Sequence, residues 1–359
     1  MKKAIVAVPF LKGTGGTETV IKNFSQALEV RDNKYGISWK LISLGGSEDS
    51  EWLAGWNKKI YSFSRYRYIQ LIAYISIMPY LIFKILKDEK PDFFIATNPV
   101  IWSIAYKFRK NISPKTKIIA WYHYSFKMKK VKKRYLKKAD YFWAISSGIK
   151  DELISLEVPA QKIKLIYNPV NTIGSRLVKR SGNQNNFIYI GRADYSYQKN
   201  VSELIKALNC LKGHWHFSFY GDIRAEVKKK LLQLSTPKVR KNITFKGYYE
   251  NIWNHINVAD AIVLTSKFEG LPMVLIESGI RGIELISSDC PMGPKDIINE
   301  ENGYLYSSGN FEELSTLLQE IIDKKTMLKE PQKISDSMNI FSYEEYRKRV
   351  LGSFKSWRE

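Results

Sequence analysis

The amino-acid sequence predicts an α/β fold of two doubly wound, Rossmann-like domains that face each other across a cleft. Short apolar runs without alternation are typical of buried parallel strands, and amphipathic helical patterns separate them. This succession of strands and helices occurs twice along the chain and restarts at Phe187. A chain of 359 residues is also long enough for two domains of ordinary size, each with its own core.

A strand from Ala4 to Phe10 opens the first half, and residues 11–18 form a glycine-containing loop before an amphipathic helix. Such a unit lets backbone amides approach a phosphate, although a plain tight turn is the alternative interpretation. A nicotinamide dinucleotide would need the spacing G-x-G-x-x-G and an acidic residue at the end of the second strand. The strand from Trp39 to Leu44 ends in Gly45 and Gly46 instead, so the sequence disfavours a dinucleotide site.

Sixteen residues without a charge, from Tyr68 to Phe83, lie between Arg67 and Lys84. A helix needs roughly 20 apolar residues to span a bilayer, and this stretch is shorter and contains Pro79. We therefore expect no membrane crossing here. The favoured interpretation is a helix packed on the sheet of the first domain, and the alternative is a partly exposed helix that docks in the headgroup region of a membrane.

Three further strands are predicted in the first half, namely Asp92 to Thr97, Lys117 to Tyr122 and Asp140 to Ile145. The second of them delivers His123 to the carboxyl edge of the sheet, where open α/β sheets bind ligands. A structural and a catalytic role both stay open for this lone histidine. Ser146 or Ser147 is expected to cap the helix that follows the third strand.

The net charge of +22 implies an anionic partner, which could be nucleic acid, an anionic membrane surface or a phosphorylated substrate. Eight of the twelve residues 127–138, here called the basic segment, are Lys or Arg. Nucleic-acid-binding surfaces interleave basic and aromatic residues, whereas Tyr135 is the one aromatic residue of the basic segment. We therefore expect no nucleic acid, and we prefer contact with an anionic membrane to the alternative, a solvated basic surface.

The second half begins after a polar connection, Ser175 to Asn186, which is expected to be exposed. A strand from Phe187 to Ile190 leads there into a loop, residues 191–200, that carries Arg192 and Lys199. Two cations at the carboxyl end of a strand suit a diphosphate leaving group, because negative charge develops on it as its bond to the transferred group breaks. Two more strands are expected at Trp215 to Tyr220 and Ile243 to Lys246.

The stretch after a buried strand, Ala261 to Leu264, gives the strongest indication of a reactive site. Glycine and proline turn residues precede a helix there, so that Glu269 lies in the loop at the carboxyl end of the strand. Glu277 lies about one turn into the helix. We therefore expect both carboxylates to face one cleft. The free N–H groups of Met273 and Val274 at the start of the helix suit an anion.

Both glutamates lie in the segment F-E-G-L-P-M-V-L-I-E, which resembles the signature of retaining, nucleotide-sugar-dependent glycosyltransferases of the GT4 family, whose fold is GT-B. The segments L-T-S-K-F-E-G-L-P-M and I-S-S-D-C-P-M-G-P-K-D-I-I are similar to those of the bacterial lipopolysaccharide 1,6-galactosyltransferase group. The resemblance implies transfer of a hexose (galactose, glucose or N-acetylhexosamine) from a UDP-sugar to a hydroxyl of a cell-surface glycan precursor or glycolipid, with retention of anomeric configuration. A sugar phosphorylase of the same fold is the alternative enzyme, and a basic nucleic-acid-binding protein is the alternative from another class.

The resemblance also implies roles for single residues. Arg192 and Lys199 would bind the donor diphosphate, and Glu277 would bind the ribose hydroxyls. Glu269 would bind the hydroxyls of the donor sugar, and His123 would contact the same sugar. Arg192, Lys199, Glu269 and His123 are thus the expected catalytic residues. The remaining expected donor-binding residues are Gly15, Gly16, Tyr248, Leu271, Met273 and Val274.

No Asp-x-Asp sequence occurs, so we expect no metal ion or other cofactor, and we expect Arg192 and Lys199 to neutralise the diphosphate. The resemblance implies an acceptor-side domain of residues 1–168 and a nucleotide-sugar-binding domain of residues 169–340. Ser342 and Glu345 form a capping-box pair for a last helix. That helix would return to the first domain over residues 341–359.

Two cysteines, Cys210 and Cys290, exclude a disulfide framework and fit a reducing cytosol. Together with the basic segment, they predict a cytoplasmic enzyme that associates peripherally with the inner face of the plasma membrane. The donated sugar and the acceptor stay open. So does the origin of retention, which is either a carboxylate nucleophile or a front-face attack assisted by the leaving phosphate.

Overall fold

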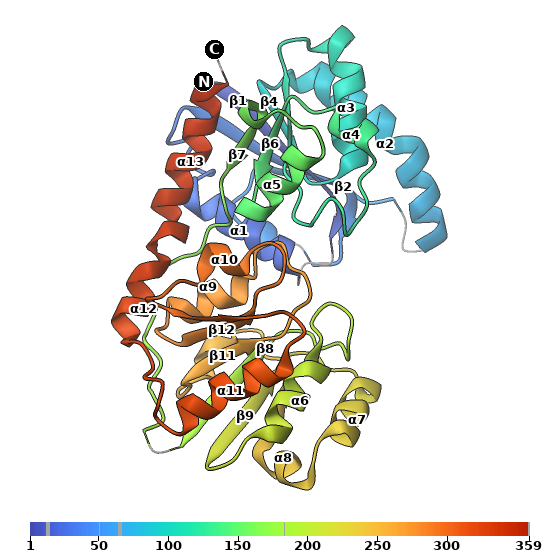
Figure 1. Ribbon diagram of the computed structural model, residues 1–359. Helices are drawn as coiled ribbons and strands as arrows, with labels where there is room; N and C mark the ends of the chain where they lie inside the picture. The colour runs from blue at the N-terminus through green and yellow to red at the C-terminus, as the bar shows by residue number, and fades with distance from the viewer. Residues whose placement is uncertain (12–14, 50, 64–66, 183, 358–359) are drawn as a thin grey trace. The chain divides into compact units, whose positions relative to one another are not determined.

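The computed structural model describes residues 1–11, 15–49, 51–63, 67–182 and 184–357, which form two compact units (Figure 1). Unit 1 contains Met1–Asn171 and Phe341–Glu359, and unit 2 contains Thr172–Ile340. The boundary expected from the sequence, between residues 168 and 169, lies slightly earlier in the chain. The C-terminal segment belongs to unit 1, which is the unit to which the sequence assigned it.

Unit 1 is built on a seven-stranded sheet in the order β3-β2-β1-β4-β5-β6-β7. All neighbouring strands are parallel, so both faces of the sheet need a cover of helices. From β1 the chain continues to β2 on one side, and it later returns to β4 on the other side of β1. The carboxyl ends of β1 and β4 therefore form the topological switch point. The strands are β1 (Lys2–Leu11), β2 (Ile37–Ser47), β3 (Lys58–Tyr61), β4 (Phe93–Ala96), β5 (Lys117–Ala120), β6 (Tyr141–Ala144) and β7 (Ile163–Leu165).

Two helices, α1 (Gly16–Ala27) and α13 (Tyr343–Ser356), pack together on one face of this sheet. Phe24 of α1 is fully buried, and its ring lies 5.0 Å from the ring of Trp121. Phe354 of α13 lies 4.1 Å from the ring of Phe93. The N–H of Glu345 donates to Ser342 Oγ at 3.4 Å, so Ser342 is the expected N-cap of the last helix.

The other helices of unit 1 include α2 (Arg67–Glu89), α3 (Pro99–Ile112), α4 (Lys133–Leu136) and α5 (Ser147–Ser155). Helix α3 contacts both α2 and α4, and Figure 1 shows this group on the opposite side of the strands from α13. Ser146 is the N-cap of α5, since its Oγ accepts the N–H of Ile149 at 3.3 Å. The sequence predicted a cap at Ser146 or Ser147.

Helix α2 only partly follows the favoured interpretation of a helix packed on the sheet. Its C-terminal half buries Leu81, Ile82, Ile85 and Leu86. Residues nearer its N-terminus include several exposed large apolar side chains. None of the helices among the described residues is both long and apolar enough to cross a membrane.

Unit 2 has a six-stranded parallel sheet in the order β10-β9-β8-β11-β12-β13. Strands β8 and β11 are neighbours, and the chain moves in opposite directions from them, so their carboxyl ends form the switch point of this unit. The strands are β8 (Asn185–Ile190), β9 (Trp215–Tyr220), β10 (Ile243–Gly247), β11 (Ala261–Leu264), β12 (Glu284–Ser288) and β13 (Gly303–Tyr306).

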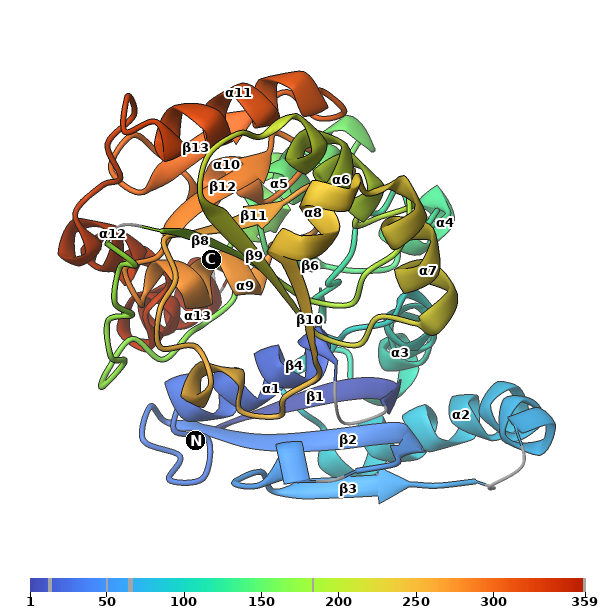
Figure 2. The ribbon, with the colours of Figure 1, turned by 90° about the horizontal axis from the view of Figure 1, so that it is seen from below.

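The helices of unit 2 form two groups on the two faces of its sheet (Figure 2). Helix α6 contacts α7, α8 and α11, whereas α9 contacts α10 and α12. The bounds are α6 (Val201–Cys210), α7 (Ala225–Leu234), α8 (Pro237–Asn242), α9 (Met273–Gly279), α10 (Pro294–Ile297), α11 (Phe311–Ile322) and α12 (Pro331–Ser337).

The connection from Ser175 to Asn186 is only partly exposed, whereas its polar composition predicted an exposed linker. Val178 is buried, and the Arg180 guanidinium donates to the backbone carbonyl of Asp260. The buried carboxylate of Asp260 accepts the N–H groups of Ser181 at 3.0 Å and Asn186 at 2.7 Å. Polar residues of the connection serve here as hydrogen-bonding partners of a buried acid. The sequence of the connection does not reveal this role, because Asp260 lies far away in the chain.

Candidate functional site

Two loops meet at the switch point of unit 2. Residues 191–200 follow β8, and residues 265–272 follow β11, its neighbour in the sheet. Crevices outside the carboxyl ends of diverging parallel strands are where open α/β sheets bind their ligands. The topology therefore brings together the two segments that the sequence singled out for Arg192, Lys199 and Glu269.

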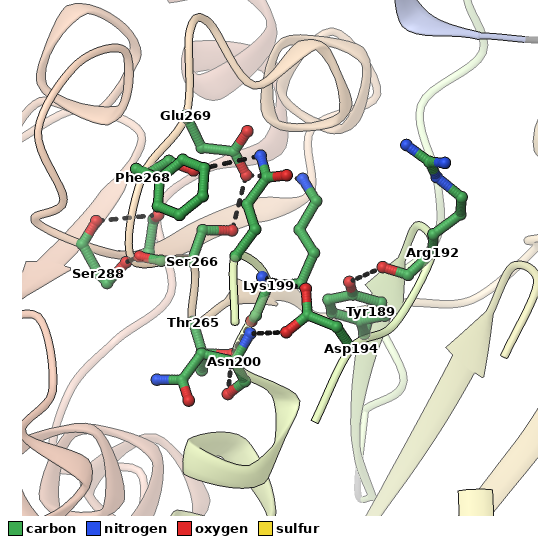
Figure 3. Close-up of polar contacts among 12 residues, drawn as sticks. Tyr189, Arg192, Asp194, Lys199, Asn200, Thr265, Ser266, Phe268, Glu269 and Ser288 are labelled. Atoms are coloured by element: carbon green, nitrogen blue, oxygen red, sulfur yellow. Dashed lines mark hydrogen bonds and ion pairs between the residues drawn. The ribbon is translucent and has the colours of Figure 1, made fainter. Parts of the chain in front are cut away.

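The carboxylate of Asp194 fixes the shape of the first loop (Figure 3). It accepts the N–H groups of Tyr197 and Lys199, both at 2.7 Å, and that of Asn200 at 3.2 Å. Asn200 has a φ of 49°, in the left-handed region that asparagine adopts more readily than most residues. These contacts set the direction in which the Lys199 side chain leaves the loop.

The second loop is hydrogen-bonded to the first. Thr265 Oγ1 donates to the carbonyls of Lys199 at 2.9 Å and Asn200 at 3.1 Å. The N–H of Lys267 donates to the carbonyl of Gln198 at 2.8 Å. The backbone on both sides of the site is therefore fixed before any ligand binds.

Lys199 and Glu269 form an ion pair between the two loops, with Nζ 2.6 Å from Oε1. Ser266 Oγ donates to the same oxygen at 2.6 Å. The Glu269 side chain is 8% exposed and that of Lys199 is 25% exposed, so water screens this pair less than an ion pair on the surface. The described residues form no hydrogen bond to Glu269 Oε2, which leaves this oxygen available to a ligand hydroxyl.

Arg192 does not join this pair. Figure 3 shows its side chain beyond Tyr189, with no contact from its guanidinium to Lys199 or Glu269. The loop is held there through the backbone, because Tyr189 Oη donates to the Arg192 carbonyl at 2.8 Å. The side chain of Arg192 is exposed, and among the described residues its guanidinium has no hydrogen-bonding partner. It is thus a free cation on the same loop as Lys199.

Glu277 is half-buried on α9 and has two partners that the sequence did not reveal. Trp253 Nε1 donates to its Oε2 at 3.3 Å, and Arg281 Nη1 donates to its backbone carbonyl at 2.8 Å. The guanidinium of Arg281 lies 4.1 Å from the centre of the Trp253 ring, in a cation–π contact. Burial raises the pKa of Glu277 above its ordinary value. No spacing rule links Trp253 to a glutamate on another element, whereas Arg281 sits one helical turn after Glu277.

The turn before α9 is held close to the loop after β12. Gly293 has a φ of 98°, and a Cβ there would lie 2.6 Å from Pro272 Cδ, so only glycine fits. Leu271 is buried, while Met273 and Val274 are half-buried in the first turn of α9. Tyr248 follows β10 and is 63% exposed. The expected donor-lining residues of unit 2 are thus placed, and among them Lys199 and Glu269 form an ion pair.

Two candidate glycines lie at the start of α1 in unit 1. A Cβ on Gly15 would lie 2.5 Å from Oε2 of Glu18, which is the end of a flexible side chain and can move aside, so packing alone does not require glycine. A Cβ on Gly16 would approach none of the described atoms within 4 Å, so close packing against them does not explain this glycine. Residues 12–14 of the predicted phosphate loop lie outside the described residues.

His123 follows β5, as predicted, and its imidazole is enclosed. Both ring nitrogens are buried and have no hydrogen-bonding partner among the described residues. The ring lies 4.6 Å from that of Trp121. Burial lowers the pKa of His123 to about 3, so the imidazole is neutral at physiological pH. A neutral imidazole has one donor and one acceptor to offer a ligand.

No group of three or more His, Cys, Asp or Glu residues that could hold a metal ion occurs in the part of the chain that the structure describes.

Two family models and several known proteins match the chain. Residues 14–173 match the family model described as Glycosyltransferase Family 4, and residues 176–338 match Glycosyl transferases group 1. Over 348 residues the chain is 32% identical to the lipopolysaccharide 1,6-galactosyltransferase of Escherichia coli (strain K12), which covers 95% of this chain and 94% of the relative.

Solved structures confirm the predicted GT-B fold. The lipopolysaccharide outer core galactosyltransferase WaaB, in its apo form, matches with a TM-score of 0.85 at 27% identity and covers 99% of both chains. The Anabaena protein HepE in complex with UDP-glucose matches with a TM-score of 0.75 over 98% of this chain and 99% of its own. The last pair is 14% identical, which shows a shared fold alone.

The enclosed imidazole of His123 leads to a prediction about pH. The unfolded chain takes up a proton on this residue below about pH 6.5, whereas the folded protein does so only near pH 3. His123 therefore stabilises the fold fully above pH 6.5, and this contribution falls as the pH drops towards 3. In NMR titrations from pH 8 to pH 5, the His123 signals should not move. A His123 resonance that titrates near pH 6.5 would show that the ring is solvated.

Proposed function

Because the chain belongs to the glycosyltransferase family that includes the lipopolysaccharide 1,6-galactosyltransferases, we propose that it transfers a hexose from a UDP-sugar to a hydroxyl of a cell-surface glycan precursor or glycolipid. Galactose is the first candidate, since the relative from Escherichia coli carries that activity in its name. The observation that carries the proposal is the pair Lys199–Glu269 at the switch point of unit 2. It joins a cation suited to a diphosphate to a carboxylate suited to a sugar.

Lys199 and Arg192 supply the positive charge that the leaving diphosphate needs in this proposal. Lys199 is already oriented by the loop and by Glu269, so it stabilises developing charge without reorganising. Arg192 has a guanidinium free of described partners, and this group can bind two phosphate oxygens at once. We propose that these two cations take the place of a metal ion and that no cofactor takes part.

The carboxylates of Glu277 and Glu269 bind two other parts of the donor, the ribose and the sugar. Glu277 accepts hydrogen bonds from the ribose hydroxyls and is held for this by Trp253. Glu269 accepts from a sugar hydroxyl through Oε2, because Oε1 is already engaged by Lys199 and Ser266. Tyr248, Leu271, Met273 and Val274 keep their proposed places around the donor. The assignment of Gly15, Gly16 and His123 to the donor rests on the family resemblance.

The two hydrogen bonds that Glu269 accepts also bear on how the anomeric configuration is retained. The ammonium group of Lys199 and the hydroxyl of Ser266 both donate to Oε1 and stabilise the negative charge that the two carboxylate oxygens share. Oε2 is therefore a weaker nucleophile than an oxygen of a free carboxylate. We therefore propose that Glu269 positions the sugar and that the acceptor attacks from the side of the leaving phosphate. In this proposal the phosphate takes the proton of the acceptor hydroxyl.

We place the enzyme at the cytoplasmic face of the membrane, where the basic segment faces anionic lipid. Lys127, Lys129 and Lys130 are exposed. The start of the segment is held by the buried carboxylate of Glu152, which accepts the N–H groups of Phe126 at 2.8 Å and Lys127 at 3.0 Å. The lysines thus project from a fixed backbone, and each attracts an anionic surface by about 1 kcal/mol.

The function is tested by product analysis. Incubation with a panel of UDP-sugars and lipid-linked glycan acceptors should give one product one hexose heavier than its acceptor, with UDP-galactose as the preferred donor. NMR of that product should show the α configuration of the donor preserved. Inversion of the anomeric centre, or phosphate-dependent cleavage of a glycan in place of transfer, would contradict the proposal.

The diphosphate site is tested by substitution. Because each cation stabilises the leaving group, Lys199→Ala and Arg192→Ala should each lower kcat by roughly a hundredfold, as for the loss of one oxyanion donor. Arg224→Ala removes a cation that is exposed on unit 2 and is the matched control, with activity unchanged. EDTA should have little effect. Loss of activity with EDTA that Mg²⁺ restores would overturn the metal-free proposal.

A further inference from the structure

The part of α2 between Ile69 and Tyr80 exposes large apolar side chains to solvent. Ile72 and Ile75 are 67% and 64% exposed, and Tyr80 is 61% exposed. Ile69 and Ile77 are exposed as well. Single exposed apolar residues are common, but five within twelve residues of one helix form a patch of the kind that marks an interaction site.

Three of the five exposed residues lie on the side of α2 that faces away from the core. Ile75, seven positions before the buried Ile82, lies instead on the side that is packed further along the helix. At 3.6 residues per turn, Ile69, Ile72 and Tyr80 point to one side of the helix. Met78, Leu81, Ile82, Ile85 and Leu86 fall on the opposite side and are buried. The packed side alone therefore holds the helix in place. The outward residues are not needed for that purpose.

Basic residues border the apolar face. The chain carries no charge from Tyr68 to Phe83, and the exposed Lys84 and Lys87 follow in the next turns of α2. Lys107 and Lys110 are exposed on α3, which contacts α2. Helix α4, which also contacts α3, lies within the basic segment. Figures 1 and 2 show α2, α3 and α4 as neighbours in unit 1.

An apolar face bordered by lysines suits the surface of an anionic bilayer. Isoleucine and tyrosine fit the boundary between headgroups and acyl chains, and lysines reach from there to lipid phosphates. A second copy of the chain is a poorer occupant, because a symmetric contact through this face would bring the basic borders of two highly basic chains together.

We propose that the outward face of α2 inserts into the interfacial region of an anionic lipid leaflet, with the helix lying in the membrane plane. The basic segment supplies long-range attraction, and the apolar face of α2 supplies attachment that salt does not screen. This inference deepens the membrane part of the proposed function, but vesicle binding needs no turnover. A failure of the inference therefore leaves the transferase proposal untouched, and the reverse also holds.

The test compares two variants on vesicles of phosphatidylglycerol and phosphatidylethanolamine. Variant A is Ile69→Gln, Ile72→Gln, Ile77→Gln and Tyr80→Gln, and its control changes the same four residues to Leu. Variant B is Lys129→Gln, Lys130→Gln, Lys132→Gln and Lys133→Gln. Sedimentation with the vesicles is measured at 0.1 M and 1 M NaCl, where the Debye length falls from about 10 Å to about 3 Å.

At 0.1 M NaCl both variants should bind at least about tenfold more weakly than the parent chain, and the Leu control should bind as the parent does. At 1 M NaCl the parent and variant B should keep a similar residual affinity, because lysines are then screened, while variant A should lose it. Equal binding of variant A and the parent at both salt concentrations would overturn the proposal. So would a parent dimer that variant A converts to a monomer without a change in vesicle binding.

A second measurement does not depend on how variant A folds. In a Cys210→Ser background, an environment-sensitive fluorophore on Ile72→Cys should shift to the blue on anionic vesicles and be quenched by lipids with a nitroxide on the acyl chain. The same label on Met327→Cys, an exposed apolar position of unit 2, is the control and should not respond. An unchanged spectrum at position 72 on bound protein would overturn insertion of α2.

Discussion

The ion pair between Lys199 and Glu269 is the contact around which the candidate site is arranged. The two residues are 70 positions apart in the sequence, and only the neighbouring positions of β8 and β11 in the sheet bring their loops together. Asp194 and Thr265 fix the backbone on either side, so the pair forms on a prepared frame. A buried carboxylate without such a partner would be costly, which ties the position of Glu269 to that of Lys199.

Much of the fold was predictable because buried parallel strands appear in the sequence as short apolar runs. The strands β1, β2, β4, β5, β6, β8, β9, β10 and β11 all fall where the sequence placed a strand. Three of the four edge strands, β3, β7 and β13, were not predicted as strands. Each is short and carries polar, charged or glycine residues, since an edge strand buries less surface. Helix α2 shows the opposite error, because its apolar composition predicted burial where the structure exposes isoleucines.

The positions of charged site residues were predictable where the residue lies in a loop directly after a predicted strand. Lys199 and Glu269 come together as the loop positions after β8 and β11 implied, whereas Arg192 lies apart from them. Trp253 could not be found from the sequence, because it is 24 residues from Glu277 and on another element. Asp194 was within reach, since an aspartate at the start of a loop often accepts later backbone N–H groups.

Binding of UDP and of uridine, measured by calorimetry, tests the assignment of the donor site most directly. Glu277→Ala removes a charge-assisted acceptor of the ribose hydroxyls and should weaken both ligands by about tenfold or more. Lys199→Ala removes a partner of the diphosphate, and it should weaken UDP by a similar factor while leaving uridine unchanged. The account is contradicted if UDP binds both variants as tightly as the parent chain, because the diphosphate and the ribose would then lie elsewhere.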